Sequence, residues 1–254
     1  MSCHSFDVNW HAEKMSTHTV KLKERREVAE GTMAFHMEKP PNFQYKAGQF
    51  INVTLIHPPE TDAEGNTRSF SIASAPFEED LVFATRMRAT AFKRVFKTLE
   101  PGSEVRISGP FGSFLLHADA SRPAVFLVGG IGITPFRSII LDATRKELAH
   151  KLYLFYSNRR PEDAAFLEEL REAEENNPNY KFIGTMTQMQ KSRLPWRGEI
   201  GSINHEMLTK WITKLKGPIY YSAGPPTMVA AMRQMLTGSG ISDDDIRTEE
   251  FSGY

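Results

Sequence analysis

The segment RSFSIAS, Arg68 to Ser74, combines one cation, one aromatic ring and several hydroxyl groups in a short stretch. Because successive side chains of a strand point to opposite faces, Phe70 and Ser71 would lie on opposite sides. Simple alternation requires neither the arginine nor so many hydroxyls. One interpretation is an edge strand with a solvated face. The other is a strand whose polar side chains serve a function.

A second candidate is VGGIGITP, Val128 to Pro135, which follows the apolar run AVFLV. Its glycines would let the backbone approach a pyrophosphate closely, and the amino terminus of the following helix would attract its charge. The third glycine of the usual dinucleotide fingerprint is replaced here by Thr134 and Pro135. The alternative is a tight turn between a strand and a helix.

Two further segments end predicted strands. YSNRRPED offers Ser157, Arg159 and Arg160 where a dinucleotide fold reads the adenosine ribose, and cations and hydroxyls there favour a 2′-phosphate. This favours NADP, and NADH stays open because the arginines could equally be solvated loop charges. In YYSAGPPTM, Gly224 and Pro225 predict a rigid turn. Its backbone could pack beside a flat ring, or the segment could serve only as a turn.

The elements that would position these segments differ between the two halves of the chain. Residues up to about 120 form short alternating segments separated by Gly, Pro, Asn and acidic residues, which indicates an antiparallel β-barrel. After Ser121, apolar strands alternate with helical segments, which indicates a parallel α/β sheet with helices on both faces. We therefore expect a leader at 1–15, a barrel domain at 16–119 and an α/β domain at 120–254.

Composition excludes several classes of protein. The 31 basic residues balance the 31 acidic ones, so no global charge favours nucleic acid or an anionic membrane. The single cysteine, Cys3, rules out an internal disulfide and an iron–sulfur cluster. The histidines have no zinc-site spacing, and no serine elbow or nucleophilic cysteine is evident. Without a signal peptide or a bilayer-spanning apolar run, we expect a cytoplasmic protein.

Five segments in this order resemble the signatures of the ferredoxin–NADP reductase family. RSFS looks like that family's R-x-[YF]-[ST] flavin motif, and the others are GPFGSF (109–114), GGIGITP, YSAGPPTM and the terminal EEF. The resemblance covers residues 16–254. It implies an antiparallel FAD-binding barrel followed by an NAD(P)-binding domain, in agreement with the two halves described above.

The resemblance also implies roles on the flavin side. Arg68 and Ser69 would contribute to FAD binding through the motif strand, with Arg68 on the phosphates. Phe70 would pack on the flavin, and Ser71 would hydrogen-bond near N5, the atom that accepts the hydride. The resemblance implies further FAD contacts from a strand, Thr85, Arg86 and Met87, and from the turn after it, Thr90, Ala91, Phe92 and Lys93. In that turn, Lys93 stands where relatives have serine.

On the nucleotide side, the resemblance places Gly130, Gly132 and Thr134 at the pyrophosphate and nicotinamide. Ala223 stands where many relatives have a cysteine, just before Gly224 and Pro225. A terminal aromatic residue, Phe251 or Tyr254, would cover the flavin ring and yield to nicotinamide.

The function implied is that of a flavoprotein reductase. NAD(P)H would reduce FAD, and electrons would pass to a separate acceptor such as ferredoxin, flavodoxin or an oxygenase component. Basic residues such as Lys93, Arg94 and Lys97 could dock an acidic partner, or form a solvated helix face. The alternatives are a free-flavin reductase and a non-catalytic flavin- or nucleotide-binding redox sensor or scaffold.

Overall fold

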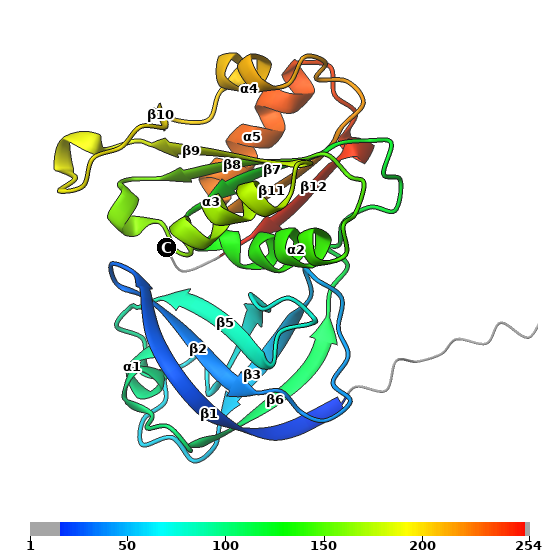
Figure 1. Ribbon diagram of the computed structural model, residues 1–254. Helices are drawn as coiled ribbons and strands as arrows, with labels where there is room; N and C mark the ends of the chain where they lie inside the picture. The colour runs from blue at the N-terminus through cyan, green and yellow to red at the C-terminus, as the bar shows by residue number, and fades with distance from the viewer. Residues whose placement is uncertain (1–15, 252–254) are drawn as a thin grey trace, which may run out of the picture.

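The computed structural model describes residues 16–251, which form two domains stacked on each other (Figure 1). The predicted leader at 1–15 and the predicted aromatic Tyr254 lie outside the described residues. The N-terminal domain consists of β1 (Ser16–Ala29), β2 (Thr32–Glu38), β3 (Phe50–Leu55), β4 (Thr67–Ser71), β5 (Asp80–Arg86), α1 (Ala91–Thr98) and β6 (Glu104–Phe111).

The N-terminal strands form an antiparallel sheet in the order β4-β3-β6-β1-β2-β5. The long β1 pairs with β6 through its first residues and with β2 through its later ones, so it bends across the domain. The two ends of the sheet approach each other just after the motif strand, where Ala73 N donates to Val82 O at 2.7 Å. This closure confirms the predicted barrel and places β4 beside β5.

The C-terminal domain contains a parallel sheet in the order β10-β9-β8-β7-β11-β12. Figure 1 shows α2 and α3 on the face toward the barrel and α4 and α5 on the other face. Every residue of β7 and β11 is buried, as expected for central parallel strands. Its elements are β7 (Ala124–Gly129), α2 (Thr134–Arg145), β8 (Leu152–Asn158), α3 (Leu167–Asn176), β9 (Tyr180–Met186), β10 (Glu199–Ile200), α4 (His205–Trp211), β11 (Ile219–Gly224), α5 (Pro226–Gly238) and β12 (Ile246–Glu250).

Two helices begin only after a short 3₁₀ turn. A 3₁₀ turn at Gly130–Ile133 precedes α2, so Ile133 is the N-cap, and the Thr134 hydroxyl donates back to Ile131 O. The acidic helix α3 begins at Leu167, after a 3₁₀ turn at Pro161–Asp163.

The two domains share one apolar cluster. Ala73, Val82 and Ala84 of the barrel pack in the same cluster as Ile131 and Phe136 of the second domain. The end of the motif strand and the central part of β5 therefore lie against the glycine turn that follows β7. This contact brings the two predicted halves of the site together.

Candidate functional site

The flavin-motif residues gather around the start of α1. Phe70 stacks on Phe83 with centroids 4.6 Å apart and lies 5.9 Å from the Phe92 ring. The Arg68 guanidinium lies over Phe92 at 5.3 Å, and Met87 packs against the same apolar cluster. The structure thus brings together side chains from β4, from the end of β5 and from α1.

Polar groups at the start of α1 complete this half of the site. Thr90 is the N-cap, and its hydroxyl accepts from Lys93 N at 3.3 Å. The Lys93 ammonium folds inward and donates to Arg86 O at 2.8 Å. Arg68 faces the same helix end, and Asp62 contacts both Arg68 and the backbone N–H of Ala91. Cations and free amides at a helix amino terminus suit an anionic ligand.

Three other predicted residues have different surroundings. Ser69 is exposed and donates to Asn52 Oδ1 at 2.6 Å, on the side of the strand away from Phe70. Ser71 is buried and lies opposite Phe50 of β3 in the β3–β4 pairing. Thr85 is buried, and its hydroxyl lies 3.5 Å from Arg86 O, the oxygen that also accepts from the Lys93 ammonium. Ser69 therefore lies apart from the cluster around Phe70.

The glycine turn after β7 contacts the end of β11 directly. A Cβ added to Gly132 would lie 2.5 Å from Ala223 O, and one added to Gly224 would lie 3.0 Å from Gly129 O. Gly224 also has a φ of +151°, which side chains rarely adopt. Pro225 is the N-cap of α5. The glycine turn and the end of β11 therefore lie side by side and carry mostly small residues, which fit a pyrophosphate and a flat ring: Gly130, Gly132, Thr134, Ala223, Gly224 and Pro225.

The predicted ribose-reading residues lie at the end of β8. Ser157 pairs in register with Gly129, so it lies beside the glycine turn. Arg159 is exposed, whereas Arg160 forms ion pairs with Asp163 at 2.9 Å and with Glu30 at 3.1 Å. Glu30 belongs to the turn between β1 and β2, so Arg160 already links the two domains. Arg159 is the better placed of the two arginines to meet a ligand.

The carboxyl-terminal residues reach the same region. Phe251 N donates to Gly224 O at 3.0 Å, and its ring packs against the cluster that the two domains share. Phe251 therefore lies beside the end of β11 and against the apolar cluster that the two domains share. Two residues earlier, Glu249 pairs with Ala223 across β12 and β11, and its Oε2 is buried without a hydrogen-bond partner among the described residues. Burial raises the pKa of Glu249 to about 7. Glu249 was not among the predicted site residues, although it lies in the EEF segment.

This carboxyl should make stability depend on pH. Because the pKa of Glu249 is higher in the folded chain than in the unfolded one, ionisation destabilises the fold as pH rises from about 4.5 to above about 7. We expect thermal unfolding of wild type to show a loss of stability over this range that Glu249→Gln lacks. The exposed neighbour Glu250→Gln serves as the control. Parallel curves for wild type and Glu249→Gln would contradict the assignment.

Arg137 was also missed by sequence reasoning. It is 6% exposed, lies on α2 and donates to Glu78, Glu169 and the backbone oxygen of Ala73, at distances between 2.6 and 3.0 Å. Glu78 and Ala73 belong to the barrel domain, so this side chain holds the end of the motif strand against the nucleotide domain. The only sequence signal is a charge on the otherwise apolar face of TPFRSII.

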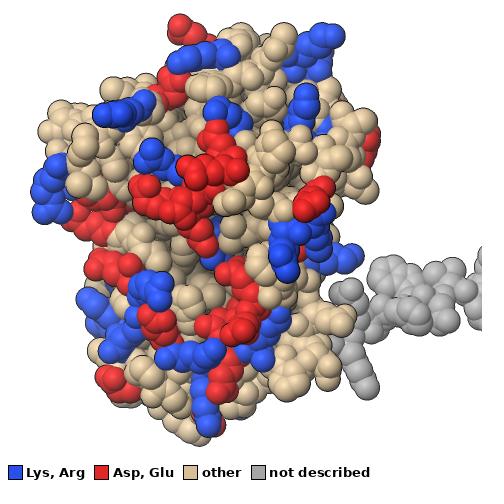
Figure 2. Space-filling model, in the orientation of Figure 1, with Lys and Arg blue, Asp and Glu red and all other residues tan. Residues whose placement is uncertain are grey.

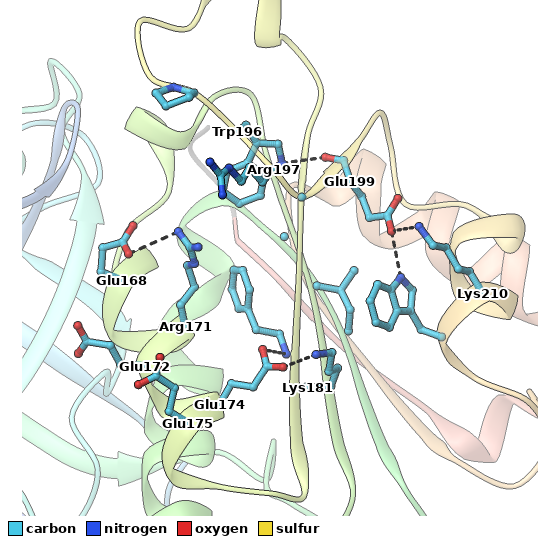
Figure 3. Close-up of a pocket in the computed structure, with 16 residues that line it drawn as sticks. Glu168, Arg171, Glu172, Glu174, Glu175, Lys181, Trp196, Arg197, Glu199 and Lys210 are labelled. Atoms are coloured by element: carbon cyan, nitrogen blue, oxygen red, sulfur yellow. Dashed lines mark hydrogen bonds and ion pairs between the residues drawn. The ribbon is translucent and has the colours of Figure 1, made fainter.

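A large groove lies away from this site, at the edge of the parallel sheet between α3 and the β9–β10 edge (Figure 3). Its volume is about 1210 Å³. Its charges are largely paired with one another: Glu168 with Arg171, Glu174 with Lys181, and Glu199 with Lys210. It contains none of the predicted site residues, so we assign the chemistry to the interface between the domains, despite the size of the groove.

Residues 16–251 contain neither a membrane-spanning helix nor a metal cluster. No helix in this range is long and apolar enough to cross a bilayer. Within the same range, no group of three or more His, Cys, Asp or Glu side chains is arranged to hold a metal ion.

Comparison with known proteins agrees with this geometry. Residues 126–234 match the family model for the oxidoreductase NAD-binding domain. The chain is 28% identical over 235 residues to the phenol hydroxylase P5 protein of Acinetobacter pittii, covering 91% of this chain and 64% of that protein. It is 30% identical over 203 residues to a component of the Na(+)-translocating NADH-quinone reductase of Methylococcus capsulatus, covering 73% of this chain and 49% of that protein. The chain thus spans about half to two thirds of the length of these relatives.

Solved structures share the fold. A cytochrome P450 reductase from Amycolatopsis superposes with a TM-score of 0.79 at 22% identity, covering 93% of this chain and 70% of that one. A ferredoxin NADP+ reductase from Neisseria gonorrhoeae, with bound FAD and NADP, superposes with a TM-score of 0.74 at 19% identity. The superposition covers 92% of this chain and 98% of that one. The chain therefore contains an oxidoreductase NAD-binding domain, and its two-domain fold resembles that of the ferredoxin–NADP reductase family.

Proposed function

We propose that the protein is a flavoprotein reductase that takes a hydride from NAD(P)H onto FAD and passes electrons to a separate acceptor. The observation that carries this proposal is the shared contact between β4–β5 and the glycine turn after β7, with Phe251 beside both. When bound, FAD supplies the ability to accept two electrons and to release them singly.

The chain's own residues would bind, orient and shield the cofactors. Arg68 and the first amides of α1 supply donors for phosphate oxygens, and Phe70 and Met87 supply apolar surface. Gly132 and Gly224 let the turn after β7 pack directly against the end of β11, and we place the nicotinamide beside this junction. Phe251 excludes water from the shared cluster and would have to yield to the nicotinamide ring. Ser71 remains our candidate for the hydrogen bond near flavin N5.

A separate acceptor is supported by the names of the relatives, which include a phenol hydroxylase component and a P450 reductase. We favour an oxygenase component or a ferredoxin-like protein. The basic residues proposed to dock it are not a uniform patch: Lys93 folds inward, Arg94 pairs with Glu60, and Lys97 is exposed. Figure 2 likewise shows acidic and basic side chains interspersed on the face that it presents.

Arg159 is our candidate for discriminating between the nicotinamide cofactors. Because it is exposed at the ribose-reading strand end, Arg159→Ala should raise KM for NADPH by roughly tenfold, the size of one charge-assisted contact to phosphate. KM for NADH should change less than twofold. Steady-state kinetics with both cofactors measure this, with the exposed Arg171→Ala on α3 as the control. Equal losses for NADH and NADPH would reject the role.

The proposal is tested by reconstituting the protein with FAD and screening acceptors. A catalyst should oxidise NADH or NADPH in the presence of ferricyanide, a ferredoxin or an oxygenase component. Rapid turnover with free flavin alone would favour the free-flavin reductase. Binding of FAD and nucleotide without turnover on any acceptor would favour the sensor or scaffold.

A further inference from the structure

The loop between β3 and β4, residues 57–66, folds back over the motif strand. Asp62 Oδ1 accepts from Arg68 Nη2 at 2.9 Å, and Asp62 Oδ2 accepts from the backbone N–H of Ala91 at 3.0 Å. Glu64 pairs with the same guanidinium at 3.0 Å. The other terminal nitrogen of Arg68 donates to the backbone carbonyls of Glu64 and Gly65 in this loop and to that of Thr67 at the start of β4.

The groups that hold Asp62 form an anion site. Ala91 is the first residue of α1, whose first turn carries no acidic side chain. Burial lowers the pKa of Lys93, and the nearby cations Arg88 and Arg68 lower it further. Positive charge is therefore concentrated at this helix end, and Asp62 supplies an anion that neutralises part of it.

We propose that Asp62 is an internal competitor for the pyrophosphate of the flavin nucleotide, and that its release from Arg68 determines how tightly FAD is held. This inference rests on the proposed function. A carboxylate and a phosphate use the same donors, and two anions cannot share one guanidinium and one helix end without strong repulsion. FAD binding would therefore require the 57–66 loop to give up Arg68 and the Ala91 amide.

The exchange is physically accessible. The Asp62 side chain is 30% exposed and that of Arg68 is 17% exposed, so the pair lies near the surface. Exposed ion pairs contribute little, and the loop can move outward without opening the barrel core. The competing explanation is that Asp62 only caps α1. Asparagine caps a helix about as well as aspartate, so Asp62→Asn separates the two roles by removing charge while keeping an acceptor.

The test is a titration of the apoprotein with FAD, in which binding is measured by the quenching of flavin fluorescence. We expect Asp62→Asn to lower the Kd for FAD by about tenfold, the size of one charge-assisted contact that no longer has to be broken. Glu60→Gln is the matched control, since Glu60 lies in the same loop and pairs with Arg94 instead. It should leave the Kd within about twofold. Circular dichroism verifies that each variant is folded.

A double variant identifies the contact responsible. Arg68→Ala should weaken FAD binding, and in that background Asp62→Asn should give less than twofold further change. An unchanged or weaker affinity in Asp62→Asn alone would overturn the inference and leave the proposed function intact. A gain that persists without Arg68 would also overturn it. Failure of wild type and all variants to bind FAD would instead overturn the proposed function, and the inference with it.

Discussion

Gly132→Ala is expected to lower kcat/KM for NAD(P)H by roughly 100-fold, because small displacements of a positioning turn have effects of that size. The new Cβ would lie 2.5 Å from Ala223 O and 2.7 Å from Gly224 N, both backbone atoms of β11. Because these are backbone atoms, no side-chain rotation can relieve the contact. The turn or the strand end must move, and both belong to the surface predicted to hold nicotinamide. FAD content should stay near that of wild type, since the barrel is untouched.

Steady-state kinetics and flavin absorbance of the purified variant measure the two expectations separately. Gly238→Ala is the matched control, because nothing lies within 4 Å of a Cβ there and α5 ends at that residue. A Gly132→Ala enzyme with wild-type kcat/KM would show that the turn after β7 does not position the nicotinamide. Loss of FAD together with activity would point to a general folding defect.

Arg137→Met is expected to lower the free energy of unfolding by about 3 kcal/mol, as when one partner of a buried ion pair is removed. The guanidinium bridges Glu78 of the barrel and Glu169 of α3, and it also donates to Ala73 O. Burial opposes its charge, but the hydrogen bonds to both carboxylates outweigh burial and raise the pKa of Arg137. Methionine fills similar volume and leaves both carboxylates without this cation.

Thermal unfolding of the flavin-loaded variant should show a midpoint roughly 5–10 °C below wild type. Arg145→Met, on the same helix but exposed, controls for loss of charge. Because Arg137 holds the motif strand against α2, kcat should also fall while FAD stays bound. A midpoint equal to that of the Arg145 variant would contradict the role of Arg137 as the interdomain link.

The parts of the fold that could be predicted depend on local pattern. The alternating N-terminal strands and the continuous apolar run of β7 follow from side-chain periodicity, and the glycine turn follows from backbone requirements. The order of the motifs also assigned Arg68 and Phe70 to the barrel and Gly132 and Ala223 to the parallel-sheet domain, where the structure has them. Parallel neighbours β7 and β11 bring the glycine turn and the Ala223 segment together, because their carboxyl ends lie at the same edge.

The residues that were missed depend on contacts between distant segments. Arg137 pairs with side chains 59 and 32 residues away, and Asp62 meets Ala91 29 residues away. Glu249 is notable only because packing buries its Oε2. Exposed residues of the same types, such as Arg159, Asp243 and Glu250, occur elsewhere in the chain, so residue type alone does not distinguish these three.

The central claim is that a flavin on the barrel is reduced directly by a nicotinamide held at the glycine turn. Anaerobic stopped-flow mixing of the FAD-loaded protein with NADH or NADPH measures this step by the bleaching of the visible flavin absorbance. The account predicts full bleaching whose rate saturates with cofactor concentration and falls in Gly132→Ala. A flavin that stays oxidised with both cofactors would contradict it.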